Sequence, residues 1–511
     1  MSLTNITIKN IGFNFLATLG ERGLTTIARL IMFGVLANSD IGLASFAILV
    51  LDFATKFRDL GLGQAVIYFD EKIDEMLDTS LFLIAGFSLI LCIGAFFSST
   101  LIGNFFNDPL SIPMIKVISI QIFLGSLASV PWLYIYKTLK FKYLMYQRII
   151  GAFLIAVLSI SFAYMGFRAW SIVLPLVIVE FFNITFLWLI AGYKPRIRFN
   201  PEIAKKMFSY SKYIVLSAII AFLTVNMDRG FIQKILGSGS LGIFTVGMTL
   251  VYQPIIQPYH QIESVMFPTF SMIKDDIEKY RKAYLRAIGL ICTLTSFVTG
   301  FIFIAVEYFI PIIYESRLYP AISIAKLLSL LFCIRTIAST SSPVFRSKGK
   351  PEFISFISGG QGLLVFILLT YFGMGLNLTQ ICNVLIGIQV LSLIAALYYS
   401  FKFANVALFE GIKMVLKPLI AASLSTAISY YLIKMILDKG IFSFRILNTI
   451  SIFMKNSLKI PALPEAINGL VLSIFIYVIM GFIFNILINK GLFVYTFEKL
   501  REYYRQIRIF S

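Results

Sequence analysis

Basic residues occur inside long apolar stretches near the start of the chain, where most of their neighbours are aliphatic or aromatic. Arg22 and Arg29 are seven residues apart, which is about two turns of an α-helix, so both side chains belong to one helix face. An arginine can hold a phosphate or a carboxylate through two parallel hydrogen bonds. Two arginines on one face of a membrane-embedded helix therefore indicate an anion-binding site.

The next apolar stretch also carries charge. Asp52, Lys56 and Asp59 follow the i, i+4, i+7 spacing of one helix face, and Arg58 lies beside that stripe. A charge facing lipid at the bilayer centre costs from ~3 to more than 10 kcal/mol, so these side chains are expected to face protein or water. Further charges at membrane depth are those of Glu180, Asp228, Arg229, Lys326 and Arg335.

Two interpretations of these charges remain open. They can form internal ion pairs, such as Asp52 with Lys56, or Glu21 with an arginine of a neighbouring helix. Alternatively, the excess of positive charge in the first two apolar stretches and in the stretch at residues 320–344 calls for an anionic ligand in a water-filled cavity. The residues predicted to bind that anion are Arg22, Arg29 and Arg58. Those predicted to line the cavity, couple an ion or act as a gate are Asp52, Lys56, Glu180, Asp228, Arg229 and Arg335.

A proline-containing segment, VYQPIIQPYHQIES, covers residues 251–264. Pro254 and Pro258 each remove a backbone donor, which predicts a kinked or broken helix. Broken helices at membrane depth are typical of substrate pathways and moving parts. The polar side chains of the segment predict a helix-packing or sugar-binding patch formed by Gln253, Gln257 and His260. His260 is the only histidine, and neither a metal site nor a cofactor is predicted.

The elements that position these residues are predicted to be membrane-spanning helices. The chain is 59% hydrophobic and 14% charged, whereas a soluble chain is about 25% charged. Apolar runs of about 20 residues, the length that crosses a bilayer, recur throughout. We predict an all-α polytopic membrane protein with fourteen spans, at residues 10–36, 41–67, 79–104, 112–136, 147–166, 169–192, 210–236, 241–268, 285–313, 320–344, 352–374, 379–401, 413–436 and 466–488.

The distribution of basic residues predicts the orientation of the spans. The loops 137–148 and 193–206 are rich in Lys and Arg, whereas the turns 38–40 and 107–111 have none. Basic loops stay on the cytoplasmic side, which places the N- and C-termini there. This topology also accounts for the net charge of +19 without a nucleic-acid partner.

One pattern occurs twice. RLIMFGVLANSDIG runs from Arg29 to Gly42, and RGFIQKILGSGSLG runs from Arg229 to Gly242. Six predicted spans separate the copies, and an even number returns the chain to the same side, which indicates a parallel repeat. Asp228 and Arg229 are expected to form a local ion pair or gate. The predicted parts are an N-terminal six-helix lobe (1–195) and a C-terminal six-helix lobe (196–403) around a central cavity, two additional helices (404–490), and a basic amphipathic cytoplasmic tail (491–511).

Three stretches carry a family resemblance: residues 28–67, residues 243–288, and RSKGKPEF at 346–353. In them the chain resembles the polysaccharide transporters of the multidrug/oligosaccharidyl-lipid/polysaccharide exporter superfamily, the branch of O-antigen, colanic acid and teichuronic acid exporters. The resemblance implies a flippase of the bacterial inner membrane, which moves undecaprenyl-pyrophosphate-linked oligosaccharide by alternating access. It also implies, as partners, the lipid-linked substrate, membrane lipids, a proton or sodium ion, and a polysaccharide polymerase with its chain-length regulator.

The resemblance further implies roles for individual residues. Related flippases of lipid-linked peptidoglycan precursors hold the pyrophosphate with arginines of the first two helices, and Arg22, Arg29 and Arg58 are the matching residues here. Asp52 and Glu180, with Asp228, are the candidates for ion coupling. When a headgroup with about two negative charges moves outward across an inside-negative membrane, its electrostatic free energy falls by roughly 5 kcal/mol at 100 mV.

Two other functions compete with the flippase. A multidrug-type cation antiporter would favour acidic cavity walls, whereas the first two spans are net basic. A membrane-embedded polysaccharide polymerase or glycosyltransferase would need a sizeable outer domain, and the one long outer segment, residues 438–464, lacks paired carboxylates. The sequence contains no GxxxxGK[ST] nucleotide loop. We therefore predict a transporter rather than an enzyme.

Overall fold

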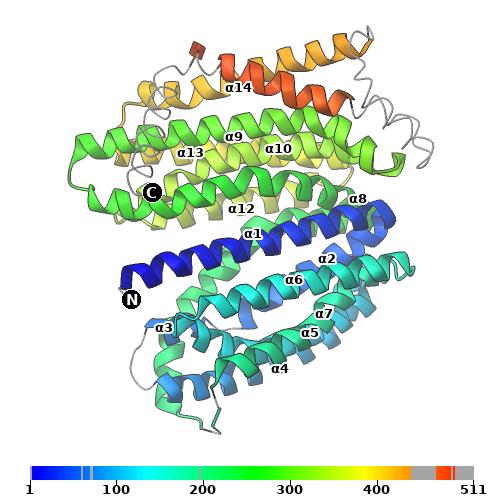
Figure 1. Ribbon diagram of the computed structural model, residues 1–511, viewed down its shortest axis with the longest axis vertical. Coiled ribbons are helices and arrows are strands. Elements are labelled where there is room, and N and C mark those ends of the chain that lie inside the picture. The colour runs from blue at the N-terminus through cyan, green and yellow to red at the C-terminus, as the bar shows by residue number, and fades with distance from the viewer. Residues whose placement is uncertain are drawn as a thin grey trace. The chain divides into compact units, whose positions relative to one another are not determined.

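The computed structural model describes residues 3–58, 61–68, 73–193, 195–196, 198–438, 468–484 and 487–488. Every regular element within these ranges is a helix (Figure 1). Ten helices of the described part are long and apolar enough to cross a membrane, which confirms the prediction of an all-α polytopic membrane protein. The number fourteen stays a prediction, and the predicted tail at 491–511 lies outside the described residues.

Contacts divide the chain into two compact units, Met1–Thr245 and Val246–Ser511, called here the N-terminal and the C-terminal unit. Each is described by itself. The predicted lobes, with boundaries at residues 195 and 403, stay predictions.

The N-terminal unit is organised around one interior helix, α5 (Ser111–Lys137). This helix packs against α2, α4 and α7, while α1 packs along α6 (Figure 1). The most apolar window of α5 is 56% buried, against 17% for α4, so α5 forms the core and α4 turns most of its surface outward. The other helices of the unit are α1 (Leu3–Val35), α2 (Asn38–Arg58), α3 (Leu62–Tyr68), α4 (Ile73–Phe105), α6 (Phe141–Tyr164), α7 (Trp170–Ala191) and the first part of α8 (Pro201–Met272).

Helix α8 is interrupted at Gly237, where φ is 76° and ψ is 179°. This backbone conformation is open essentially to glycine alone, because a Cβ would clash there. Two helices therefore meet at this residue, 201–236 and 238–272. The turn predicted between spans ending at 236 and beginning at 241 lies here.

The two copies of the repeated pattern meet in space within the N-terminal unit. A methyl group at Gly42 would overlap the carbonyl oxygen of Ser238, in the turn of the second copy. A methyl group at Gly242 would overlap the carbonyl oxygen of Asn38, in the turn of the first copy. Each copy thus places its glycine against the other's turn, and the contact is reciprocal.

The C-terminal unit packs α9 against α10 and α14, and α10 against α13 (Figure 1). Its core holds tyrosines with satisfied hydroxyls: Tyr284 donates to Ser400 at 2.8 Å, and the Tyr280 hydroxyl lies 2.6 Å from that of Ser347. The elements after α8 are α9 (Ile277–Ile313), the 3₁₀ turn η1 (Ser316–Leu318), α10 (Pro320–Ser339), α11 (Ser341–Ser347), α12 (Glu352–Phe372), α13 (Leu378–Phe403), α14 (Leu408–Asp438) and a helix over Asn468–Phe484.

Candidate functional site

The N-terminal unit contains an open cavity of about 740 Å³, called here the basic cavity. Residues of α1, α2, α3, α4, α5, α6 and α7 and of the first part of α8 form its wall. Its volume falls within the ~300–1,000 Å³ typical of small-molecule sites. The polar and aromatic side chains that line it are Glu21, Thr55, Lys56, Arg58, Ser129, Trp132, Tyr136, Gln147, Arg148, Glu180 and Asn183.

Arg58 reaches the cavity wall because α5 has a glycine opposite it. A Cβ at Gly125 would overlap the Nη1 of Arg58 and would lie 3.5 Å from the Oε1 of Glu180. The guanidinium of α2 and the carboxylate of α7 therefore approach each other across the bare backbone of α5. Any larger residue at position 125 would occupy the place of the guanidinium.

A chain of amide groups continues from Glu180 along the wall. The Nδ2 of Asn183 donates to the Oε2 of Glu180 at 3.1 Å, and the Nε2 of Gln147 donates to the Oδ1 of Asn183 at 2.7 Å. Gln147 belongs to α6, whereas the other two belong to α7. The cavity thus combines a charged end with side chains that both donate and accept hydrogen bonds.

Glu21 on α1 forms an ion pair with Arg148 on α6, with 3.3 Å between the carboxylate oxygen and Nε. Arg148 also donates to the side-chain oxygen of Asn14 at 3.1 Å. The pairing of Glu21 with an arginine of a neighbouring helix, one of the two interpretations of the buried charges, is therefore present. It neutralises one base of the cavity wall.

Among the residues that the structure describes, the lining of the basic cavity contains three basic and two acidic side chains. With Glu21 occupied by Arg148, the remaining charges are Lys56, Arg58 and Glu180, and positive charge is in excess. Positive charge is also in excess around Asp52 of α2, which lies within electrostatic range of three cations. Those cations are Arg229, Lys56 and Arg29.

The predicted site residues divide into those that line the cavity and those that do not. Lys56, Arg58 and Glu180 come together in its wall. Arg22, half-buried, and Arg29, exposed, belong to α1 but are not among the described lining residues. The roles assigned to all five stay predictions.

Asp228 and Arg229 are linked locally. The Oδ1 of Asp228 accepts a hydrogen bond from the backbone N–H of Arg229 at 2.8 Å. Asp228 is itself buried, with 9% of its surface exposed. The predicted gate role of the two residues stays a prediction, and Asp59, of the predicted charged stripe, lies outside the described residues.

The lining residues that sequence reasoning missed include Trp132, Tyr136, Gln147, Arg148 and Asn183. Gln147 and Arg148 were hidden because residues 137–148 read as a basic loop, whereas α6 already begins at Phe141. The i, i+4 spacing of Trp132 and Tyr136 was available as a signal, since such a pair shares a helix face.

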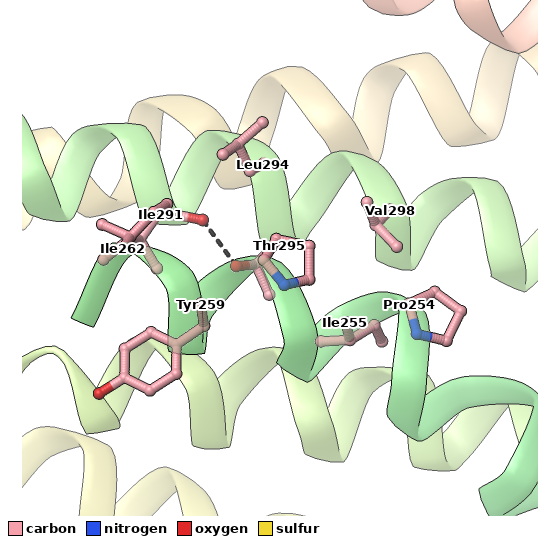
Figure 2. Close-up of a pocket in the computed structure, with 9 residues that line it drawn as sticks. Pro254, Ile255, Tyr259, Ile262, Ile291, Leu294, Thr295 and Val298 are labelled. Atoms are coloured by element: carbon pink, nitrogen blue, oxygen red, sulfur yellow. Dashed lines mark hydrogen bonds between the residues drawn. The ribbon is translucent and has the colours of Figure 1, made fainter. Parts of the chain in front are cut away.

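The proline segment of α8 belongs to the C-terminal unit. Its dihedral angles stay helical through Pro254 and Pro258, and the interruption of α8 lies at Gly237 instead. Figure 2 shows that this segment and α9 line a small, mostly apolar cavity, in which the Thr295 hydroxyl donates to the carbonyl of Ile291 at 2.6 Å. Its volume of about 10 Å³ accommodates about one water molecule. The cavity is thus too small for a substrate headgroup. The kink predicted at Pro254 and Pro258 stays a prediction.

The polar side chains of this segment pair within the C-terminal unit. The Nδ1 of His260 lies 3.4 Å from Glu263, which also accepts from Arg346 of α11 at 2.9 Å. Tyr259 donates to the carbonyl of Ser339 at 2.7 Å. The contacts tie α8 to α10 and α11, which fits a helix-packing patch. A sugar-binding role for Gln253, Gln257 and His260 stays a prediction.

The basic residues of α10 have partners in the same unit. Lys326 forms an ion pair with Glu307 of α9 at 2.5 Å, and Tyr430 of α14 donates to the same carboxylate at 3.3 Å. The Nε of Arg335 donates to the Oε1 of Gln389 at 3.3 Å. The excess positive charge expected in this span is therefore partly neutralised, which leaves the basic cavity as the stronger anion site.

Comparison with known proteins adds an independent finding. Residues 27–323 match a family model described as "Polysaccharide biosynthesis protein". The chain is 22% identical over 370 residues to the lipopolysaccharide biosynthesis protein WzxC of Escherichia coli K12, covering 70% of this chain and 73% of that protein. It is 20% identical over 426 residues to the succinoglycan biosynthesis transport protein ExoT of Rhizobium meliloti 1021, covering 83% and 86%.

Among solved structures, the lipid II flippase MurJ in an inward closed conformation is similar, with a TM-score of 0.68 and 14% identity. The match covers 93% of this chain and 99% of that one. Likeness at this identity establishes the fold alone. The family match, which spans more than half of the chain, establishes more: this multi-pass membrane protein belongs to the polysaccharide biosynthesis protein family.

Proposed function

We propose that the protein is a flippase that moves an undecaprenyl-pyrophosphate-linked oligosaccharide, an O-antigen or exopolysaccharide repeat unit, across the cytoplasmic membrane by alternating access. The observation that carries the proposal is the basic cavity of about 740 Å³, in which Arg58 lies against Gly125. The family match and the names of WzxC and ExoT support it.

The pyrophosphate contact is assigned to Arg58 together with Lys56. Both line the cavity, and a guanidinium binds phosphate oxygens through paired, charge-assisted hydrogen bonds. Arg22 and Arg29 are retained as a second positive group on α1, and Arg29 lies within electrostatic range of Asp52. A wall of positive charge attracts a diphosphate, and the attraction is stronger than in bulk water because the dielectric constant in such a cavity is lower.

The termini are proposed to be cytoplasmic, in agreement with the basic loops. Transport is proposed to use an ion gradient or the membrane potential. The acids that would couple a proton or sodium ion are Asp52, Glu180 and Asp228. Glu180 is the best placed of the three, since it lines the cavity next to Arg58.

The alternatives are less well supported. A cation antiporter would need a net-acidic site, whereas the described lining of the basic cavity has more basic than acidic side chains. A polymerase or glycosyltransferase would need paired catalytic carboxylates. In the basic cavity, Glu21 is held by Arg148 and Glu180 is hydrogen-bonded to Asn183.

The proposal is tested with the full chain reconstituted in proteoliposomes. The measured quantity is the rate at which a fluorescent polyprenyl-pyrophosphate-linked sugar becomes protected from a membrane-impermeant quencher. Arg58→Gln is expected to slow this rate by roughly 10- to 100-fold, because a hydrogen bond to a charged group contributes about 1.5–3 kcal/mol. Lys56→Gln is expected to have a smaller effect in the same direction.

The matched control is Lys142→Gln, since Lys142 is an exposed base of α6 outside the cavity lining. It should transport at the wild-type rate. Wild-type rates in both Arg58→Gln and Lys56→Gln would overturn the proposal.

A further inference from the structure

Two aromatic side chains of α5 form a shelf in the basic cavity. The rings of Trp132 and Tyr136 are 5.0 Å apart between centroids and inclined by 19°, so they are stacked. Both are half-buried, and both line the cavity. A stacked pair that still lines a cavity presents its remaining ring surface to whatever enters.

The shelf lies at a defined distance from the proposed pyrophosphate contact. Gly125, which faces Arg58, and Trp132 are seven residues apart on α5, so they share a face and are separated by about 10 Å along the helix axis. This distance is comparable to the length of a diphosphate group with one sugar ring attached. A substrate that is held by Arg58 at its diphosphate and extends along α5 would place its first sugar ring at the shelf.

The neighbouring wall has the chemistry to hold such a ring. Gln147 and Asn183 offer amide donors and acceptors, which match sugar hydroxyl and acetamido groups. A pyranose has an apolar face of C–H groups, which can pack on an aromatic ring. Its hydroxyl groups then need a few polar partners at the edge of the pocket.

We propose that Trp132 and Tyr136 form a glycan subsite, which binds the sugar directly attached to the pyrophosphate of the lipid-linked substrate. The inference rests on the proposed function and deepens it, because it separates recognition of the sugar from recognition of the diphosphate. Arg58 and Lys56 then bind any polyprenyl pyrophosphate, whereas the shelf distinguishes a loaded carrier from a bare one.

The test measures equilibrium binding to the full chain in lipid nanodiscs, with two probes. One is a short polyprenyl pyrophosphate, and the other is the same lipid carrying a single N-acetylglucosamine. Wild-type protein is expected to bind the sugar-bearing lipid more tightly. Trp132→Ala should remove roughly 2- to 10-fold of that preference, with Tyr136→Ala acting in the same direction, while affinity for the bare lipid stays unchanged.

Two further variants keep the test decisive. Trp132→Phe retains an aromatic face and should restore most of the preference. Tyr143→Ala removes an exposed aromatic ring of α6 outside the cavity lining and should change neither affinity. Unchanged affinity for the bare lipid also shows that the shelf variants are folded.

The outcomes separate the two proposals. Wild-type preference for the sugar-bearing lipid in both Trp132→Ala and Tyr136→Ala, while Arg58→Gln weakens both lipids, would overturn the glycan subsite and leave the flippase proposal standing. Failure of the wild-type protein to bind either lipid would overturn both.

Discussion

Replacing Gly42 or Gly242 by alanine should destabilise the N-terminal unit through one shared contact. A methyl group at Gly42 would overlap the carbonyl oxygen of Ser238 and stand 2.9 Å from its Cα. A methyl group at Gly242 would overlap the carbonyl oxygen of Asn38 and stand 3.2 Å from the backbone nitrogen of Gly42. The obstructing atoms are backbone, so no side chain can rotate away and two helices must separate.

The magnitude follows from two opposing effects. Overpacking of a well-packed contact costs about 1–3 kcal/mol, whereas alanine in place of glycine in a helix interior gains about 1 kcal/mol. Each single variant should therefore lose up to about 2 kcal/mol in the free energy of unfolding. Gly86→Ala is the matched control, because a Cβ there meets no atom within 4 Å, and it should gain up to about 1 kcal/mol.

The double variant Gly42→Ala/Gly242→Ala tests the reciprocity. Once one methyl group has pushed the turns apart, the second meets less resistance, so the combined loss should be smaller than the sum of the single losses. Thermal unfolding of the purified proteins in one detergent measures all four. Stability of Gly42→Ala equal to that of Gly86→Ala, or strict additivity in the double variant, would refute the reasoning.

Two further predictions concern the basic cavity and its surroundings. Gly125→Ala should move the guanidinium of Arg58 away from Glu180, because the new methyl group occupies the position of the guanidinium. The affinity for polyprenyl pyrophosphate should then fall, while the unfolding temperature changes little. Unchanged affinity would contradict this geometry. Burial, together with the hydrogen bond to Asp78, raises the pKa of Tyr193, so the stability that this group contributes is present below about pH 10 and is lost as the pH rises further. Tyr193→Phe should lower the free energy of unfolding at neutral pH by about 1–3 kcal/mol, since the buried Asp78 loses a hydrogen-bond donor. The variant should also lose less stability than the wild type above pH 10. Unfolding temperatures between pH 7 and pH 11 measure both effects, and an equal loss of stability above pH 10 in the two proteins would count against the prediction.

The pattern of apolar runs was sufficient to predict an all-α membrane protein, because the hydrocarbon core imposes a length on every helix that crosses it. The cost of a buried charge was equally informative. It drew attention to Lys56, Arg58 and Glu180, and all three line the basic cavity. Helix periodicity assigns such residues to a face, and this information is local to each helix.

Which residues a given helix face contacts depends on packing between helices that are distant in the chain. Only the tertiary structure decided these contacts. Arg58 lines the cavity and Arg29 does not, although both were predicted to bind the anion, because α5 presents Gly125 to Arg58. The ion pair of Glu21 needed the start of α6 to be known before Arg148 could be named. The repeated turn pattern was visible in the sequence at residues 29–42 and 229–242. The contact of each glycine with the backbone of the other copy results from close packing in three dimensions. The spacing of residues along the chain does not reveal that contact.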